Sequence, residues 1–160
     1  MPPDGQPKGP GRRVGPQLKQ AGEAVGINFT GATDRTPNSI MAHVALAHAL
    51  KLEDSGAAPA GTQNKLQEEI FHGYFTAGVY PDVAALTAMG DKVGLDGKKL
   101  RAALDNAVAS GAAASVQEEA AAISRSGVSG VPFFYFNKHP AFSGARDPAT
   151  IIDCFRQVTQ

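Results

Sequence analysis

Four consecutive aromatic residues, Phe133 to Phe136, constrain the fold of this chain more than any other stretch. The run is too short for a helix and is bounded by glycines and Asn137, so we predict a strand that is buried on both faces. Pro132 opens this strand, where its missing N–H does least harm to a sheet. The Val131–Pro132 bond can be cis at a cost of about 0.5–1 kcal/mol, although the local sequence by itself favours a trans bond.

The rest of the chain has mainly helical patterns. Apolar side chains recur at helical spacing, and Pro16, Asp82 and Asp147 stand where they can begin helices. After a turn that begins at Asn137, Pro140 to Ser143 can return beside the aromatic strand. We therefore predict helices over about residues 16–25, 38–52, 62–75, 82–89, 96–104 and 112–126, strands over 133–136 and 140–143, and a last helix over 147–158.

Two of these helices carry more specific expectations. Thr62 is expected to cap the helix that begins there, because a threonine hydroxyl can accept a bond from a first-turn N–H. The helix over residues 38–52 is expected to turn one apolar face toward the core, made of Ile40, Met41, Val44, Ala47 and Leu50.

Residues 127–134, Gly-Val-Ser-Gly-Val-Pro-Phe-Phe, closely resemble the cis-proline segment of the DsbA family of thioredoxin-like oxidoreductases. The resemblance covers about residues 14–160, and it is to the FrnE-like branch of that family. Three further stretches occur where that branch would have them: Arg35–Ser39 with Ala42 and His43, Leu66–Phe71 leading to Tyr74 and Phe75, and Phe142–Ala145.

The resemblance implies an α/β fold, namely a partial thioredoxin-like fold with a large α-helical insertion domain. We expect a disordered, Pro/Gly-rich tail over residues 1–15, the helical insertion over 16–126 and the C-terminal strand–strand–helix part of the thioredoxin-like domain over 127–160. The family's first strand–helix–strand unit and its Cys-x-x-Cys motif have no counterpart here. We therefore interpret the chain as an amino-terminally truncated member, with Met1 as an internal methionine.

The resemblance also implies a binding site for a thiol-containing peptide or protein. In the family, the cis-proline loop holds the substrate backbone beside a reactive cysteine, which assigns this role to Gly130, Val131 and Pro132. The alternative is a proline that only shapes the fold.

A second binding segment is implied after the returning strand. Glutathione-using relatives hold a carboxylate there on backbone N–H groups, which assigns possible glutathione binding to Ser143, Gly144 and Ala145. The alternative is an ordinary turn before the last helix.

No catalytic residue, metal ligand or cofactor is predicted. Cys154 is the only cysteine, and its place on the apolar side of the last helix favours a buried, structural thiol. Asn38 is more typical of a helix cap and His43 of a half-buried side chain. Glu68 and His72 are one turn apart but lack a third ligand nearby.

By family, the predicted function is that of a protein thiol–disulfide oxidoreductase, which we expect to be weak or inactive alone because the redox motif is missing. One alternative is a glutathione-dependent isomerase or transferase-like thiol-binding protein. Another is a non-enzymatic peptide-binding module.

Composition bears on partners and location. Fifteen basic and fifteen acidic residues cancel, so no long-range field favours nucleic acid or an anionic membrane. No apolar run is long enough for a membrane span, and the single cysteine and the missing secretory signal favour the cytoplasm. An unpaired edge on the aromatic strand would favour self-association.

Overall fold

The computed structural model describes residues 14–33 and 35–158, and the chain divides into two compact units at Val116. We call residues 14–116 the helical unit and residues 117–158 the hairpin unit. The boundary falls inside helix α6 (Ala112–Arg125). The expected tail lies outside the described residues except for Val14 and Gly15, and Val14 is buried.

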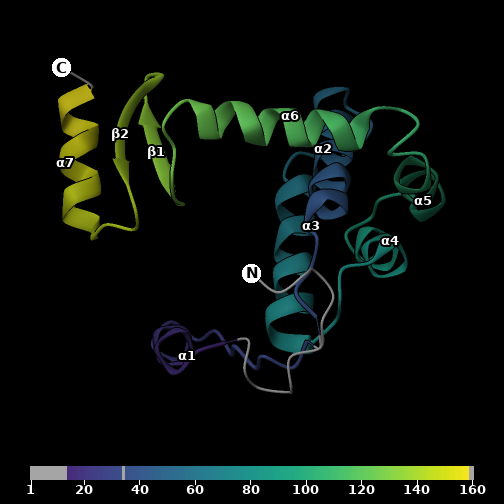
Figure 1. The fold of residues 1–160 in the computed structure, drawn as a ribbon, viewed down its shortest axis with the longest axis horizontal. Helices are drawn as coiled ribbons and strands as arrows, with labels where there is room; N and C mark the ends of the chain where they lie inside the picture. The colour runs from purple at the N-terminus through teal and green to yellow at the C-terminus, as the bar shows by residue number, and fades with distance from the viewer. Residues whose placement is uncertain (1–13, 34, 159–160) are drawn as a thin grey trace. The chain divides into compact units, whose positions relative to one another are not determined.

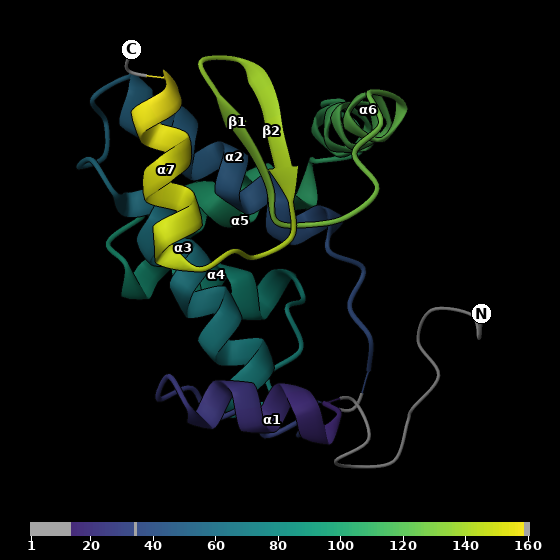
Figure 2. The same cartoon turned by 90° about the vertical axis from the view of Figure 1, so that its left-hand side faces the viewer.

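The helical unit consists of short helices, and a longer non-helical segment joins α1 to α2 (Figures 1 and 2). Asp82 and Asp96 cap the helices that follow them, as their positions in the sequence predict. The elements are α1 (Pro16–Glu23), α2 (Ile40–Asp54), α3 (Thr62–Phe71), the π-helix η1 (His72–Ala77), α4 (Val83–Lys92), α5 (Gly97–Asp105) and the first part of α6.

One hydrophobic core joins α2, α3, α4 and α5. Leu66, Leu86 and Leu100 are its largest fully buried side chains. The expected inner face of α2 is partly wrong: Val44 is buried, but Leu50 is 43 % exposed. The buried face of α2 carries small side chains instead, because helices that pack closely leave little room there. Its other members are Ala42, Ala45 and Ala49.

A glycine allows α4 and α5 to approach each other. A Cβ atom on Gly90 of α4 would lie 2.3 Å from Cδ2 of the buried Leu100, closer than real Cβ contacts come. Any larger residue at position 90 would therefore displace a core leucine.

The helix expected over residues 62–75 ends as a π-helix, a change that the apolar pattern does not reveal. Its last carbonyls are bound by a neighbouring extended segment. The Thr33 hydroxyl donates to the Tyr74 carbonyl at 2.6 Å, and the Thr30 hydroxyl donates to the Thr76 carbonyl at 2.9 Å. The carbonyls that a helix end leaves unpaired are thereby satisfied.

The N-terminus of α3 is capped from a different helix, so the prediction that Thr62 caps it is wrong. The Thr62 hydroxyl donates to the Pro59 carbonyl instead. The Glu53 carboxylate, at the end of α2, accepts bonds from the N–H of Gly61 (2.8 Å) and of Gln63. A sequence pattern cannot show this cap, because it depends on how α2 and α3 pack.

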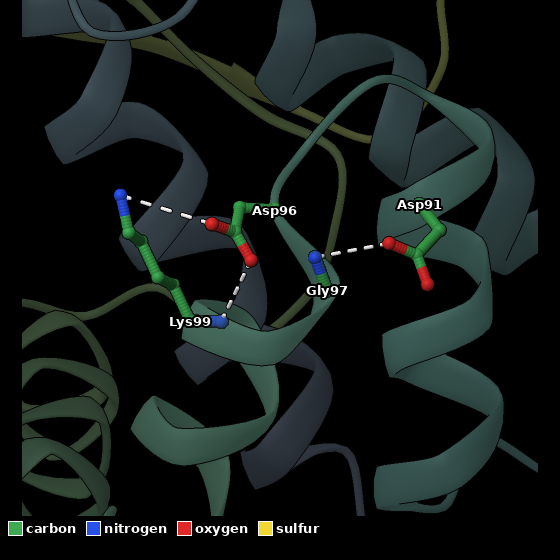
Figure 3. A network of polar contacts seen from close by, with 4 residues as sticks. All are labelled: Asp91, Asp96, Gly97 and Lys99. Atoms are coloured by element: carbon green, nitrogen blue, oxygen red, sulfur yellow. Dashed lines mark hydrogen bonds and ion pairs between the residues drawn. The ribbon is translucent and has the colours of Figure 1, made fainter.

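Two aspartates organise the turn between α4 and α5 (Figure 3). Oδ1 of Asp96 accepts the Lys99 N–H at 3.1 Å, and Oδ1 of Asp91 accepts the Gly97 N–H at 2.9 Å. A Cβ atom on Gly97 would lie 2.3 Å from that Asp91 oxygen, so a larger residue here would have to displace the Asp91 carboxylate.

The hairpin unit contains the end of α6, strand β1 (Phe133–Phe136), strand β2 (His139–Ser143) and helix α7 (Pro148–Val158). The strands form a two-stranded antiparallel sheet (Figure 2). These elements match the predicted strand–strand–helix order. The Phe136 ring packs edge-on against Phe155 of α7, with centroids 4.9 Å apart.

The prediction that β1 is buried on both faces is wrong. Phe133, Phe134 and Phe136 are half-buried, and Tyr135 is 45 % exposed. No residue in the described part of the hairpin unit is buried. A two-stranded sheet with one helix has too few neighbours to enclose its aromatic side chains.

Burial and charge make His48 of α2 a pH-sensitive group. Burial lowers the pKa of His48 below its ordinary value of 6.5, and the Lys51 ammonium lowers it further. The unfolded chain therefore binds a proton at this position more readily than the folded chain does. The contribution of neutral His48 to the stability of the fold is fully present above pH 6.5. This contribution is lost as the pH falls through 6.5 toward the lower pKa of His48 in the folded chain.

We predict that His48→Gln reduces the loss of stability between about pH 7.5 and pH 5.5, because it removes the titrating group. Urea unfolding followed by circular dichroism at the two pH values measures the effect. The control is His43→Gln on the same helix, because His43 is exposed. An unchanged pH dependence in His48→Gln would contradict the assignment.

Candidate substrate-docking site

The site begins with the turn that sets the register of the hairpin. Asn137 and Lys138 both have positive φ angles, 49° and 69°, as in the tight turns that suit twisted antiparallel strands. Phe136 then pairs with His139, and Phe133 pairs with Ser143. A register shift after Phe134 lets β2 contribute one extra residue.

This register brings the two predicted binding segments together at the open end of the hairpin. The Gly144 N–H donates to the Pro132 carbonyl at 2.8 Å. A Cβ atom on Gly130 would lie 3.8 Å from Oγ of Ser143. The predicted site residues of both segments therefore lie at one end of the hairpin: Gly130, Val131, Pro132, Ser143, Gly144 and Ala145.

Val131 is the most exposed large apolar residue of the described chain, at 89 %. The Val131–Pro132 peptide bond is cis. Within the described residues, neither the N–H nor the C=O of Val131 takes part in a backbone hydrogen bond. These groups can therefore pair with the backbone of an extended ligand.

Charged groups beside the site are engaged in local contacts. The Arg146 guanidinium lies over the Phe142 ring, 5.8 Å from its centroid. The Thr150 hydroxyl and N–H donate to the Asp147 carboxylate at 2.7 and 3.0 Å, and these bonds lower the pKa of Asp147. Asp147 thus stays ionised and caps α7, so a bound anion would lie near one cation and one carboxylate.

The other polar candidates make local contacts or are exposed to solvent. The Asn38 side chain accepts the Ile40 N–H at 3.1 Å, as a helix cap does. His43, Glu68 and His72 are exposed. In the part of the chain that the structure describes, no group of three His, Cys, Asp or Glu side chains could hold a metal ion.

Cys154 lies on α7 and is half-buried rather than fully buried. Its position near the middle of the helix places it away from the N-terminal turn, where the helix dipole would stabilise a thiolate. Among the described helices, none is both long enough and apolar enough to cross a bilayer.

A helical unit followed by an antiparallel hairpin and a packed helix is the closing part of an α/β thioredoxin-like fold. Residues 7–155 match the DSBA-like thioredoxin domain. The chain belongs to the family that this domain defines. A comparison with curated proteins gave no match.

The sequence predicted the residues of both segments, but it did not reveal what holds these segments together. The bond from Gly144 to Pro132 depends on the bulged register, which the sequence does not specify. The available signal was Gly144 itself, because a glycine after a short strand often marks a positive φ angle, and here φ is 83°.

We predict that Gly144→Ala destabilises the hairpin unit by about 1–2 kcal/mol, because a left-handed conformation is costly for a residue with a Cβ atom. Hydrogen exchange of the hairpin amides measures the change. The matched control is Gly130→Ala, because Gly130 has no positive φ angle and space for a Cβ atom. Equal exchange in the two variants would contradict the role of Gly144.

Proposed function

We propose that the open end of the hairpin binds the extended backbone of a thiol-containing peptide or protein. The chain would thus supply the substrate-docking half of a DsbA-like, FrnE-like thiol–disulfide system. The observation that carries this proposal is the exposed, unpaired backbone of Val131, held beside Pro132 and Gly144 by the hairpin register.

The chemistry of disulfide exchange limits what the chain does alone. Exchange needs a thiolate that attacks a disulfide, and a second thiol that resolves the mixed disulfide. Cys154 is the only cysteine, so the sequence contains no such pair. We therefore propose docking without redox turnover by this chain alone.

The second candidate function is glutathione-dependent chemistry at Ser143, Gly144 and Ala145. Arg146 beside this segment favours it, because its guanidinium could attract a carboxylate. The ionised Asp147 opposes it. A third candidate is a peptide-binding module without an enzymatic role, which would use the same backbone groups at Val131.

The proposal includes location and association. The single cysteine suits a reducing compartment such as the cytoplasm. Among the described residues, β1 pairs with β2 along one edge and with no strand along its other edge. We propose that this other edge supports self-association.

We predict that Val131→Pro weakens the binding of a fluorescein-labelled, cysteine-containing peptide by about tenfold or more, because it removes one backbone donor. Fluorescence anisotropy measures the affinity. The control is Val131→Thr, which keeps the backbone donor and a β-branched side chain. Equal affinities for the two variants would refute docking through the backbone.

We also predict that the chain reduces insulin no faster than a dithiothreitol control without protein, because a cysteine pair is missing. Insulin turbidity measures turnover. Turnover above the control that Cys154→Ala abolishes would overturn the structural interpretation of this cysteine.

A further inference from the structure

The two edges of the hairpin differ in their capacity to accept another strand. Gly144 donates to the Pro132 carbonyl, and alternate residues of an antiparallel strand direct their backbone groups to opposite sides. Phe133 and Tyr135 therefore direct their N–H and C=O groups away from β2. The outer edge of β2 is less suitable, since Pro140 has no N–H and the strand is bulged.

The side chains of β1 add an apolar surface to this edge. Phe133 and Tyr135 lie on one face, with ring centroids 5.0 Å apart. Phe134 and Phe136 lie on the other face, where both rings pack near Phe142. Residues 131–137 carry no charge, so no like-charge repulsion opposes a second strand at this edge.

We infer that the occupant of this edge is β1 of a second copy of the chain, paired antiparallel about a two-fold axis through Phe134. In this register, Phe133 of each copy lies opposite Tyr135 of the other, and every outward N–H and C=O of these residues is bonded. The product is a four-stranded sheet in the order β2–β1–β1–β2. The inference rests on the proposed self-association and adds its partner and register.

Order and charge favour a second copy over a flexible peptide. The outward face of β1 offers the backbone groups of two residues, so a disordered peptide would lose conformational entropy for few bonds. A second β1 is already held in its strand by β2. Antiparallel pairing also separates the two Lys138 side chains, which parallel pairing would bring together.

This register also brings the second copy to the proposed docking site. Antiparallel pairing about Phe134 brings the turn at Asn137 and Lys138 of the second copy to the end of β1 at which Val131 lies. The dimer therefore covers the backbone groups that bind substrate, and peptide and dimer compete. Strand pairing alone covers less surface than the roughly 1,200 Å² of a stable interface, so association is reversible and concentration-dependent.

Disulfide trapping tests the register in the full chain with Cys154→Ser, so that each variant has one thiol. Residues directly opposite at a non-hydrogen-bonded position have Cα atoms about 4.5 Å apart, within the range of a disulfide. Phe134→Cys, which lies on the axis, should cross-link with diamide about tenfold faster than Tyr135→Cys. Position 135 lies opposite position 133 of the second copy, so the two Tyr135→Cys thiols are further apart. Equal rates, or faster linkage of Tyr135→Cys, would overturn the register.

Sedimentation equilibrium tests the association without a new thiol. Tyr135→Pro removes one outward N–H and should weaken association about tenfold or more, whereas Tyr135→Phe keeps this donor and should not change it. A monomer at all concentrations would overturn the inference. If that monomer still binds the labelled peptide, the docking proposal stands and only the dimer inference fails. A dimer that binds no peptide would refute the docking proposal and leave the dimer inference intact.

Discussion

The pairing of two short strands determines the geometry of the proposed binding site. Asn137 and Lys138 adopt left-handed conformations, and this turn fixes which residues of β1 and β2 are neighbours. At the far end of the same ladder, the bond from Gly144 to Pro132 holds two loops side by side. Because the residue period of a strand is two, a slip of one residue would exchange the faces of β1 and separate these loops.

The helical unit and the hairpin unit are stabilised in different ways. The helical unit encloses a core of leucines and alanines, and side chains such as Glu53 and Thr33 satisfy backbone groups at helix ends. The hairpin unit encloses none of its described residues. A hairpin of this size gains little from burial, and apolar surface that stays in water contributes nothing to folding. The aromatic side chains of β1 therefore keep part of their apolar surface in contact with solvent.

The sequence predicted the order of the elements well, because apolar spacing and capping residues are local signals. Asp82 and Asp96 cap helices as expected, and Pro132 precedes a strand. It predicted the site less completely. The residues of both predicted binding segments could be named from a family resemblance, but the bond from Gly144 to Pro132 follows from a bulged register.

The wrong predictions share a physical cause. The cap of α3, the inner face of α2 and the burial of β1 all depend on which neighbour lies beside an element. Thr62 has the right chemistry for a cap, but the Glu53 carboxylate of the adjacent helix occupies that position. Four aromatic residues in succession indicate a strand with two apolar faces, but they do not indicate that this chain supplies a cover for both.

The proposed division between docking and redox chemistry rests on the same geometry. The open end of the hairpin offers backbone donors and acceptors, which recognise an extended peptide whatever its side chains are. A thiolate nucleophile requires a positive environment, such as the first turn of a helix. The first turn of α7 is capped by the ionised Asp147 instead, and Cys154 lies further along that helix. A carboxylate in this position disfavours a thiolate beside it, so the docking proposal assigns the reactive sulfur of an exchange reaction to a partner.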